Sequence, residues 1–238
     1  MAVDTSLKPN GLKVALDTIV APKEAFESIR VAPTWGWALL IVLVATLATS
    51  YLVTPAVIHG LQSDWPNMVA KNPALSGLSA DEQQARLAVS VKIAGFVWMF
   101  TPLFVLFGIL LGSVIMVIFN ALGRGDGSFG KYWAAQCNIA LTNTVGAIIL
   151  LAIVIARGVD SFTTAASVQE ALPNLGMLVP GAGKLHAFLA TFTPFTLWAA
   201  ALVIVALIII GRVPRMQASL GGFLALLLPG AIAIAFTP

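Results

Sequence analysis

The sequence has little charge. Only 10% of its 238 residues are Asp, Glu, Lys or Arg, whereas 59% are hydrophobic. A typical soluble domain is roughly a quarter charged, and a chain this apolar lacks the polar groups needed to cover a soluble core. The formal net charge is +3, and no cluster of Lys and Arg is dense enough to indicate a nucleic-acid partner. The composition therefore predicts a membrane protein of one domain or a small bundle.

Residues for catalysis and metal binding are also scarce. The single cysteine, Cys137, excludes an intrachain disulfide, and its apolar surroundings predict a packing role. His59 and His186 are too far apart in the sequence to form a metal-ligand motif. No Ser–His–acid set, H-E-x-x-H motif or pair of carboxylates falls inside an apolar stretch. We therefore expect no enzymatic activity, no metal and no cofactor.

The N-terminal segment lacks the uninterrupted apolar core of a secretory signal, because cations and anions interleave along residues 1–33. Apolar residues nevertheless recur there at helical spacing: Leu12, Leu16, Ile19 and Val20. Pro22 suits the first position of a second short helix, with Phe26 and Ile29 on one face. The pattern predicts a pair of amphipathic helices over residues 1–33 that lies in the membrane interface or packs beneath the bundle.

Five stretches contain no Lys, Arg, Asp or Glu: Thr34–Ser63, Ile93–Gly123, Tyr132–Ala156, Leu185–Gly211 and Met216–Pro238. Each is longer than the ~20 residues that cross a bilayer as a helix, and backbone in lipid must hydrogen-bond within itself. The sequence therefore predicts an all-α, polytopic transmembrane bundle over residues 34–238. The predicted spans cover approximately residues 35–60, 93–122, 132–156, 186–211 and 216–237. Pro194 and Pro229 are expected to kink the last two spans.

The second span is expected to extend beyond the membrane. Ser79 followed by Glu82 forms a capping-box signature that predicts a helix start far upstream of the apolar stretch. A helix from there to Leu122 would measure about 65 Å at 1.5 Å per residue, roughly twice the thickness of a bilayer core. We therefore expect the helix to project from the membrane, or to break near Gly95 or Pro102.

The distribution of Lys and Arg predicts the orientation of the chain. With the N-terminus inside, the inner segments hold eight cations: Lys8, Lys13, Lys23, Arg30, Arg124, Lys131, Arg212 and Arg215. The outer segments then hold five: Lys71, Arg86, Lys92, Arg157 and Lys184. Because cytoplasmic loops carry the excess of Lys and Arg, this bias predicts a cytoplasmic N-terminus and a C-terminus outside.

The loop between the second and third spans resembles two phosphate-binding motifs. Gly125, Gly127 and Gly130 match G-x-G-x-x-G, and the segment ends in Lys131 as a phosphate-binding loop would. Both motifs need a preceding strand and a soluble α/β unit, whereas a transmembrane helix is predicted on each side here. Tyr132 also occupies the position of the Ser or Thr that would hold magnesium. We therefore expect a tight turn and no bound nucleotide.

Polar, uncharged side chains gather in and beside the third span, at Asn120, Gln136, Asn138, Thr142 and Asn143. Amides in hydrocarbon need hydrogen-bond partners, so two interpretations are open. The residues could hold helices together, within the bundle or with a partner subunit. They could instead line a path for lipid or a small solute, with Asn138 and Asn143 in its wall.

Three short motifs together resemble the Yip family of Ypt/Rab-interacting membrane proteins. The residues that carry the resemblance are Pro22, Phe26 and Ile29 in the entry helix, Ser128 and Phe129 after the Gly-rich turn, and Phe195 and Trp198 in the fourth span. The resemblance covers nearly the whole chain. Relatives often have an acidic residue just before the last motif, where this chain has Thr193 and Pro194.

The resemblance implies a five-helix membrane protein with a cytosolic N-terminus and no catalytic activity. Eukaryotic members are associated with Rab GTPases and vesicle traffic and usually have a longer cytosolic N-terminal region. A bacterial inner-membrane protein is the better match, and some bacterial relatives accompany ABC-type exporters.

The sequence thus favours a non-enzymatic membrane scaffold or accessory subunit. Its expected partners are the lipid bilayer and a membrane protein, such as an exporter or trafficking component, or further copies of the chain. The alternative is a protein that conducts lipid or a small solute along the polar third span.

Overall fold

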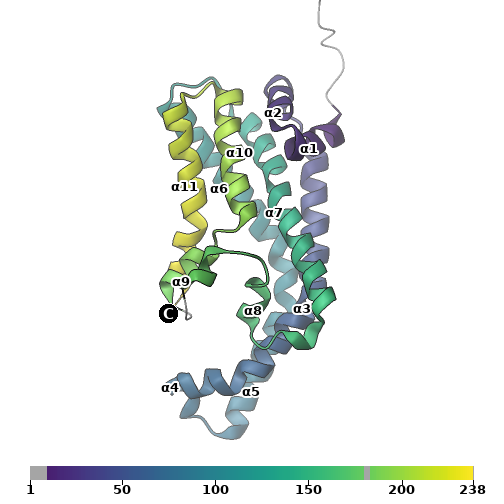
Figure 1. Cartoon of the computed structure of the whole chain (residues 1–238), viewed down its shortest axis with the longest axis vertical. Coiled ribbons are helices and arrows are strands. Elements are labelled where there is room, and N and C mark those ends of the chain that lie inside the picture. Colours follow the sequence, from purple (N-terminus) through teal and green to yellow (C-terminus); the bar gives the residue numbers. More distant parts are fainter. Residues whose placement is uncertain (1–9, 180–182, 238) are drawn as a thin grey trace, which may run out of the picture. The chain divides into compact units, whose positions relative to one another are not determined.

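The computed structural model describes residues 10–179 and 183–237, and every regular element in these two ranges is helical. The α-helices, labelled in Figure 1 where there is room, are α1 Gly11–Val20, α2 Pro22–Val31, α3 Gly36–Lys71, α4 Pro73–Ser76, α5 Ala80–Val97, α6 Thr101–Leu122, α7 Phe129–Arg157, α8 Ala165–Gln169, α9 Lys184–Ala190, α10 Pro194–Gly211 and α11 Arg215–Phe236. Three short 3-10 helices join them: η1 Trp98–Phe100, η2 Val159–Ser161 and η3 Leu175–Leu178.

Five helical segments are long and apolar enough to cross a membrane: Gly36–Lys71, Ala80–Leu122, Phe129–Arg157, Pro194–Gly211 and Arg215–Ala235. The predicted all-α bundle with five spans is therefore confirmed. The first spanning helix is longer than predicted: α3 continues to Lys71, whereas its predicted end is near residue 60. Its sequence contains Pro55 and Pro66, yet the helix passes through both.

The second span begins and breaks as the sequence predicts. Ser79 caps α5 through a capping box. The Ser79 side chain accepts a hydrogen bond from the backbone N–H of Glu82, and the Glu82 carboxylate accepts one from the backbone N–H of Ser79. The α-helix ends at Val97, one 3-10 turn follows, and α6 begins at Thr101. Pro102 then occupies the first turn of α6, where its missing N–H leaves no hydrogen bond unmade.

The fourth span starts later than expected. Residues 184–190 form a separate helix, α9, and α10 begins only at Pro194. Thr193 caps α10 through a capping box with Thr196, and the proline ring suits the first helical position. Pro194 therefore begins a span instead of kinking one. Pro229, by contrast, lies inside the continuous helix α11.

The chain divides into two compact units. The first comprises Met1–Val44, Val105–Val145 and Asn174–Pro238, and the second comprises Ala45–Phe104 and Gly146–Pro173.

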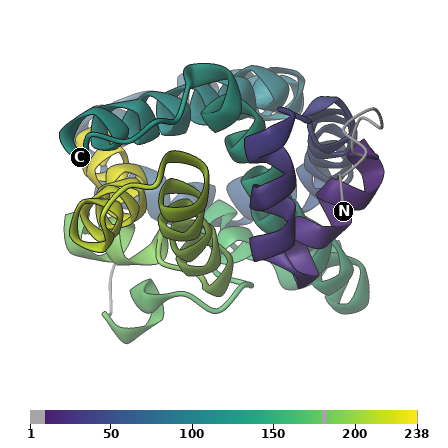
Figure 2. The ribbon, with the colours of Figure 1, turned by 90° about the horizontal axis from the view of Figure 1, so that it is seen from above.

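The first unit contains the whole of α10 and α11, parts of α3, α6 and α7, and the N-terminal helices. Seen from above, α1 and α2 lie across the helix ends, and α2 packs against α10 (Figure 2). Its main core joins α2, α7 and α10 around Phe26, Tyr132, Ile139 and Leu207, with Met116 from α6. A second cluster joins α1, α3, α6 and α7 and contains the buried Cys137 thiol, in agreement with a packing role.

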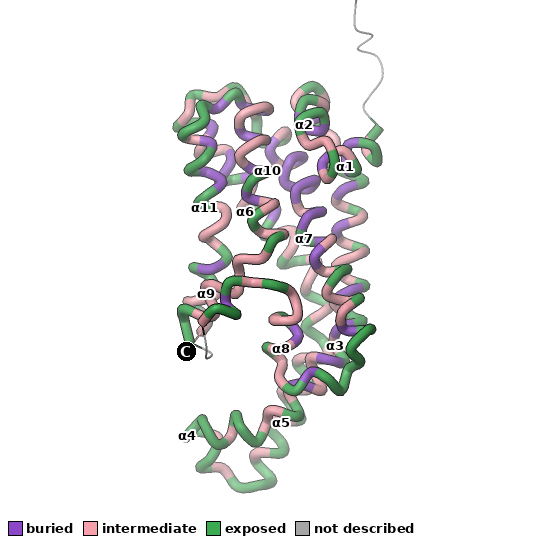
Figure 3. The backbone as a smooth tube through the Cα atoms, viewed as in Figure 1, coloured by how far each residue is buried: buried purple, intermediate pink, exposed green. Residues whose placement is uncertain are grey.

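The second unit has a smaller core. Val53 and Ala56 of α3 pack against Val154 of α7, against Phe162 in the loop that follows it and against Val168 of α8. The loop is also held by a hydrogen bond between the His59 ring and the Phe162 carbonyl, at 3.1 Å. The helices α4 and α5 contribute no buried residue, and their tube in Figure 3 is green and pink throughout.

The two predicted N-terminal helices are present, and α1 packs on the bundle through its smaller side chains. Val14, Ala15 and Thr18 are buried against the bundle. The apolar stripe at Leu12, Leu16 and Val20 is exposed instead, because these residues occupy the other side of α1: 43%, 61% and 78% of their surface is accessible. The interfacial location predicted for residues 1–9 lies outside the described residues.

Candidate functional site

The Asn120 side chain joins the end of α6 to the turn that follows it. Its amide nitrogen donates to the carbonyls of Gly125 and Gly127, at 3.3 and 3.2 Å. Its amide oxygen accepts from the Gly127 N–H at 3.0 Å and from the Tyr132 hydroxyl at 2.7 Å. Asn120 therefore uses its full set of amide groups to hold α6, the turn and the start of α7 together.

Glycines allow this polar cluster to pack closely. A Cβ atom on Gly127 would overlap the Tyr132 hydroxyl, and one on Gly211 would overlap both that hydroxyl and the Asn120 amide oxygen. Gly130, the last glycine of the apparent dinucleotide motif, has open space around it. The Gly-rich segment is therefore a turn between two spans, as predicted, and its glycines at 125 and 127 serve close packing with Asn120 and Tyr132.

The same turn is tied to the turn between α10 and α11. The Asp126 N–H donates to the Gly211 carbonyl at 2.9 Å, and the Asp126 carboxylate lies 3.6 Å from the Arg212 guanidinium. Arg124 and Arg212, which follow the two helix ends, both adopt the left-handed conformation with a φ of 52°. Four spanning helices thus meet through two cross-linked turns at one end of the first unit, at the top of Figure 1.

Gln136 fills a space that a glycine provides on α6. Its side chain lies over Gly112, where an added Cβ would come within 2.7 Å of the amide, and its nitrogen lies 3.3 Å from the Met116 sulfur. Gly112 therefore makes room for the Gln136 side chain. Gly108, one helical turn earlier, has open space around it.

Asn138 is completely buried and crosses from α7 to the segment before α3. Its amide nitrogen donates to the Thr34 carbonyl at 2.9 Å and to the Ala134 carbonyl at 2.8 Å. Its amide oxygen has no hydrogen-bond partner among the described residues. Asn138 therefore fixes the entry of the chain into the first span.

The remaining polar residues of α7 differ from one another in exposure. Thr142 and Thr144 are buried, and their hydroxyls donate to the carbonyls of Ile139 and Ala140 in their own helix. Asn143 is exposed, and no hydrogen bond joins its side chain to any described residue. It is the central residue of this 29-residue helix.

The structure does not bring the predicted polar residues into one site. Asn138 and Asn143 are five residues apart, so they project about 140° from each other around a helix of 3.6 residues per turn. Gln136 and Asn143 are seven residues apart and share a face of α7, but Gln136 is buried against α6 whereas Asn143 is exposed. Asn120 belongs to the turn cluster instead.

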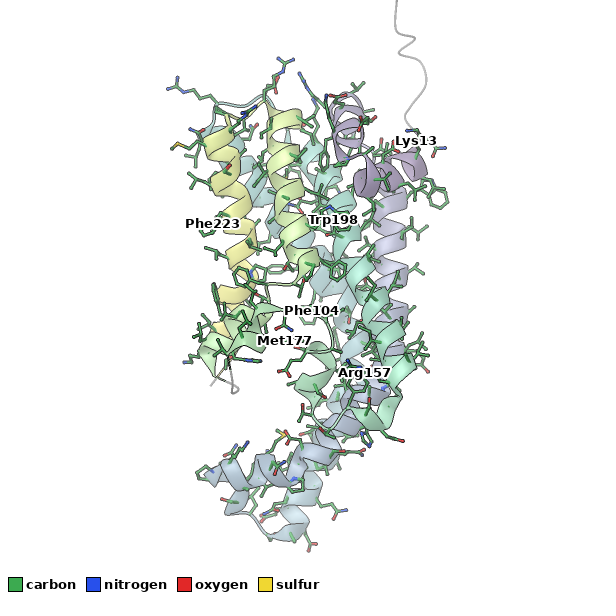
Figure 4. All side chains as sticks on the ribbon, in the orientation of Figure 1. Lys13, Phe104, Arg157, Met177, Trp198 and Phe223 are labelled. Carbon is green, nitrogen blue, oxygen red and sulfur yellow. The ribbon has the colours of Figure 1, made fainter. Side chains whose placement is uncertain are left out.

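The residues of the apparent family motifs belong mainly to the first-unit core and its edges. Phe26 and Ile29 of α2 are fully buried, and Pro22 occupies the first turn of that helix. Phe129 follows Ser128 at the start of α7 and stacks on Trp133 with a ring separation of 6.3 Å. In α10, Phe195 is half-buried, and Trp198 packs against the core that contains Phe26 (Figure 4).

The sequence does not predict that Tyr132 and Gly211 are in contact with each other. In the sequence, Tyr132 only departs from a phosphate-binding motif, and Gly211 only ends an apolar stretch. A signal was available, because both Gly123 and Gly211 stand before an arginine at the end of an apolar stretch. Glycine commonly marks the end of a helix, so these two positions could have been paired as neighbouring turns.

Among the residues that the structure describes, no three His, Cys, Asp or Glu side chains gather as a metal site. Comparison with known proteins is informative about the family. The sequence model of the Yip1 domain matches residues 16–237. The chain is also similar to a Bacillus subtilis (strain 168) protein described as "Membrane protein YknW": the two are 23% identical over 198 residues, which cover 79% of this chain and 74% of the relative. No solved structure matches the chain.

Proposed function

Because the chain belongs to the Yip1 domain family, we propose that it is a scaffold or accessory subunit that holds a membrane partner and catalyses no reaction. As a multi-pass helical membrane protein it presents helix faces to the bilayer. The observation that carries the proposal is the exposed Asn143 amide at the centre of α7.

An unpaired amide is costly in the middle of a membrane. Transfer of an amide from water to hydrocarbon without a hydrogen bond costs roughly 4–8 kcal/mol. The other amide and hydroxyl side chains of this span are buried in the unit, and several are bonded to backbone carbonyls. Asn143 is therefore the polar group of α7 that remains available to a helix outside the unit. Such interhelical amide contacts are worth about 1–2 kcal/mol in model peptides.

The N-terminal helices support a role in binding at the membrane surface. The exposed stripe at Leu12, Leu16 and Val20 is apolar, whereas Lys13 and Asp17 of the same helix form an ion pair. Phe26 fixes α2 to α10, so the stripe is attached to the spanning helices. An apolar face held at the end of a bundle suits insertion into the lipid headgroup boundary or contact with a partner helix there.

We place the chain in the bacterial inner membrane, with its N-terminus in the cytoplasm and its C-terminus outside. The excess of Lys and Arg in the short turns supports this orientation. The Bacillus subtilis relative supports a bacterial membrane. An exporter component, a trafficking component or a second copy of the chain are the partners we propose.

Replacement of Asn143 tests the proposal. Purification in mild detergent is expected to recover the protein with a stoichiometric partner or as a defined homo-oligomer. Asn143→Leu should weaken that complex about tenfold, because the lost contact is worth about 1–2 kcal/mol. The variant should keep the thermal stability of the isolated chain, since the Asn143 side chain bonds to no described residue.

Asn143→Gln is the matched control, because it keeps the amide on the same helix face. It should retain most of the complex. Recovery of a bare monomer from the unaltered protein would contradict the proposal, and so would equal recovery of the complex with leucine and glutamine at position 143.

A further inference from the structure

The positive charge of the chain is concentrated in two turns, which we call the arginine turns and define as residues 123–131 and 211–215. They contain four cations and one carboxylate: Arg124, Lys131, Arg212, Arg215 and Asp126. The whole sequence has 13 Lys and Arg and 10 Asp and Glu, so the rest of the chain holds nine of each and is neutral. The formal charge of +3 therefore belongs to the arginine turns.

The two turns are held together, and these contacts fix the backbone positions of the residues that carry the cations. The Asp126 N–H bonds to the Gly211 carbonyl, and a Cβ on Gly123 would come within 2.7 Å of the Val213 side chain. Arg124 and Arg212 are, among the described residues, the two non-glycine residues with positive φ. Their backbones are thus set by the packing of the turns, while their side chains remain exposed.

Most of this charge has no internal partner. Asp126 pairs with Arg212 at 3.6 Å, and both side chains are more than half exposed. Within the described part of the chain, no carboxylate pairs with Arg124, Lys131 or Arg215. These three cations are therefore free to pair with an anion from outside the chain.

The surroundings of the arginine turns identify the kind of anion. The turns lie at the ends of four helices that are long and apolar enough to span a membrane. Exposed apolar side chains flank the cations, namely Leu122, Phe129 and Met216, with 64%, 47% and 71% of their surface accessible. An anion in this place faces water on one side and hydrocarbon on the other, as a phospholipid headgroup does.

We propose that the arginine turns bind the phosphate groups of anionic phospholipids. Guanidinium groups offer paired N–H donors that match phosphate oxygens, and the apolar rim suits the upper part of the acyl chains. This inference goes beyond the proposed function, because its ligand is a lipid and its residues lie outside the Asn143 face. It can therefore succeed or fail independently of any protein partner.

Spin-labelled lipids test the proposal on the full-length protein in phosphatidylcholine vesicles. We expect spin-labelled phosphatidylglycerol to associate with the unaltered protein more strongly than spin-labelled phosphatidylcholine. In a triple variant with Arg124→Asn, Arg212→Asn and Arg215→Gln, the preference for phosphatidylglycerol over phosphatidylcholine should fall at least about fivefold. A fall of that size corresponds to the loss of roughly one cation at a membrane surface. Asparagine is chosen at the first two positions because it tolerates the left-handed backbone.

Two further variants separate lipid binding from folding and from overall charge. A triple variant with Arg86→Gln, Lys92→Gln and Arg157→Gln makes the same charge change in the second unit and should keep the preference. Replacement of the three turn arginines by lysine should keep part of it, because the charge remains whereas the paired guanidinium donors are lost. Thermal unfolding of each variant in detergent checks that the fold survives.

Inorganic phosphate at constant ionic strength distinguishes the two sources of the anion, and it should not displace the labelled lipid. Displacement by inorganic phosphate would overturn the lipid assignment. Equal association of the two lipids with the unaltered protein would overturn the proposal, as would an equal loss in the two glutamine-containing triple variants.

Discussion

Gly211→Ala is expected to lower the free energy of unfolding by about 3 kcal/mol or more. The added methyl group would overlap the Tyr132 hydroxyl and lie 2.6 Å from the Asn120 amide oxygen, so it would force apart the two groups that share a hydrogen bond. Overpacking of this kind costs about 1–3 kcal/mol, and separating a buried hydrogen-bonded pair costs about 1–3 kcal/mol more. Thermal unfolding in detergent, followed by tryptophan fluorescence, measures the effect.

Two further variants distinguish this clash from the general effect of alanine. Gly130→Ala adds the same methyl group near the start of α7, where nothing lies within 4 Å, and should change stability by less than about 1 kcal/mol. Tyr132→Phe combined with Gly211→Ala removes the nearest clashing atom and should recover part of the loss. Equal unfolding temperatures for Gly211→Ala and Gly130→Ala would refute the packing of the two turns described here.

Phe26→Ala should release the N-terminal helices from the bundle. The Phe26 ring is completely buried in the core that α2 shares with α10, and removal of a buried phenylalanine costs about 3–5 kcal/mol. Because α1 and α2 are short, most of that energy should appear as local opening of this segment. Limited trypsin digestion measures it, since cleavage after Lys23 or Arg30 requires α2 to unfold.

Leu16→Ala is the matched control for Phe26→Ala. Leu16 lies on the exposed stripe of α1, with 61% of its surface accessible, so its removal should leave the rate of cleavage in α2 unchanged. If Phe26→Ala and the unaltered protein are digested at the same rate, then Phe26 does not hold α2 on α10. Faster digestion of Leu16→Ala than of Phe26→Ala would lead to the same conclusion.

The sequence predicts the spans well because membrane helices obey a simple rule of length and apolarity. It predicts their ends less well. Pro194 was expected to kink a helix and instead begins one, because Thr193 caps it and the chain before it forms a separate helix. On α1 the sequence shows the apolar stripe but does not predict the face that packs on the bundle, which consists of the smaller side chains of Val14, Ala15 and Thr18.

The roles of the polar residues could not be separated by sequence alone. Asn138 and Asn143 are both asparagines of α7. Whether each is buried and hydrogen-bonded or exposed depends on which other segments pack beside it. Asn138 meets the carbonyl of Thr34, which is 104 residues away in the chain. Asn120 is engaged by Tyr132 and two turn glycines, and their approach depends on Gly211 from another helix. Such partners are set by the tertiary arrangement.

Site-specific photocrosslinking in native membranes tests the central claim, that a membrane partner covers the Asn143 face. A photoreactive residue in place of Ala147, one helical turn from Asn143, leaves the amide intact and probes the same face. The same residue in place of Phe223, which is exposed on α11, is the control (Figure 4). The proposed scaffold predicts one protein adduct of defined mass from position 147 that disappears with Asn143→Leu. Lipid adducts alone from both positions would contradict it.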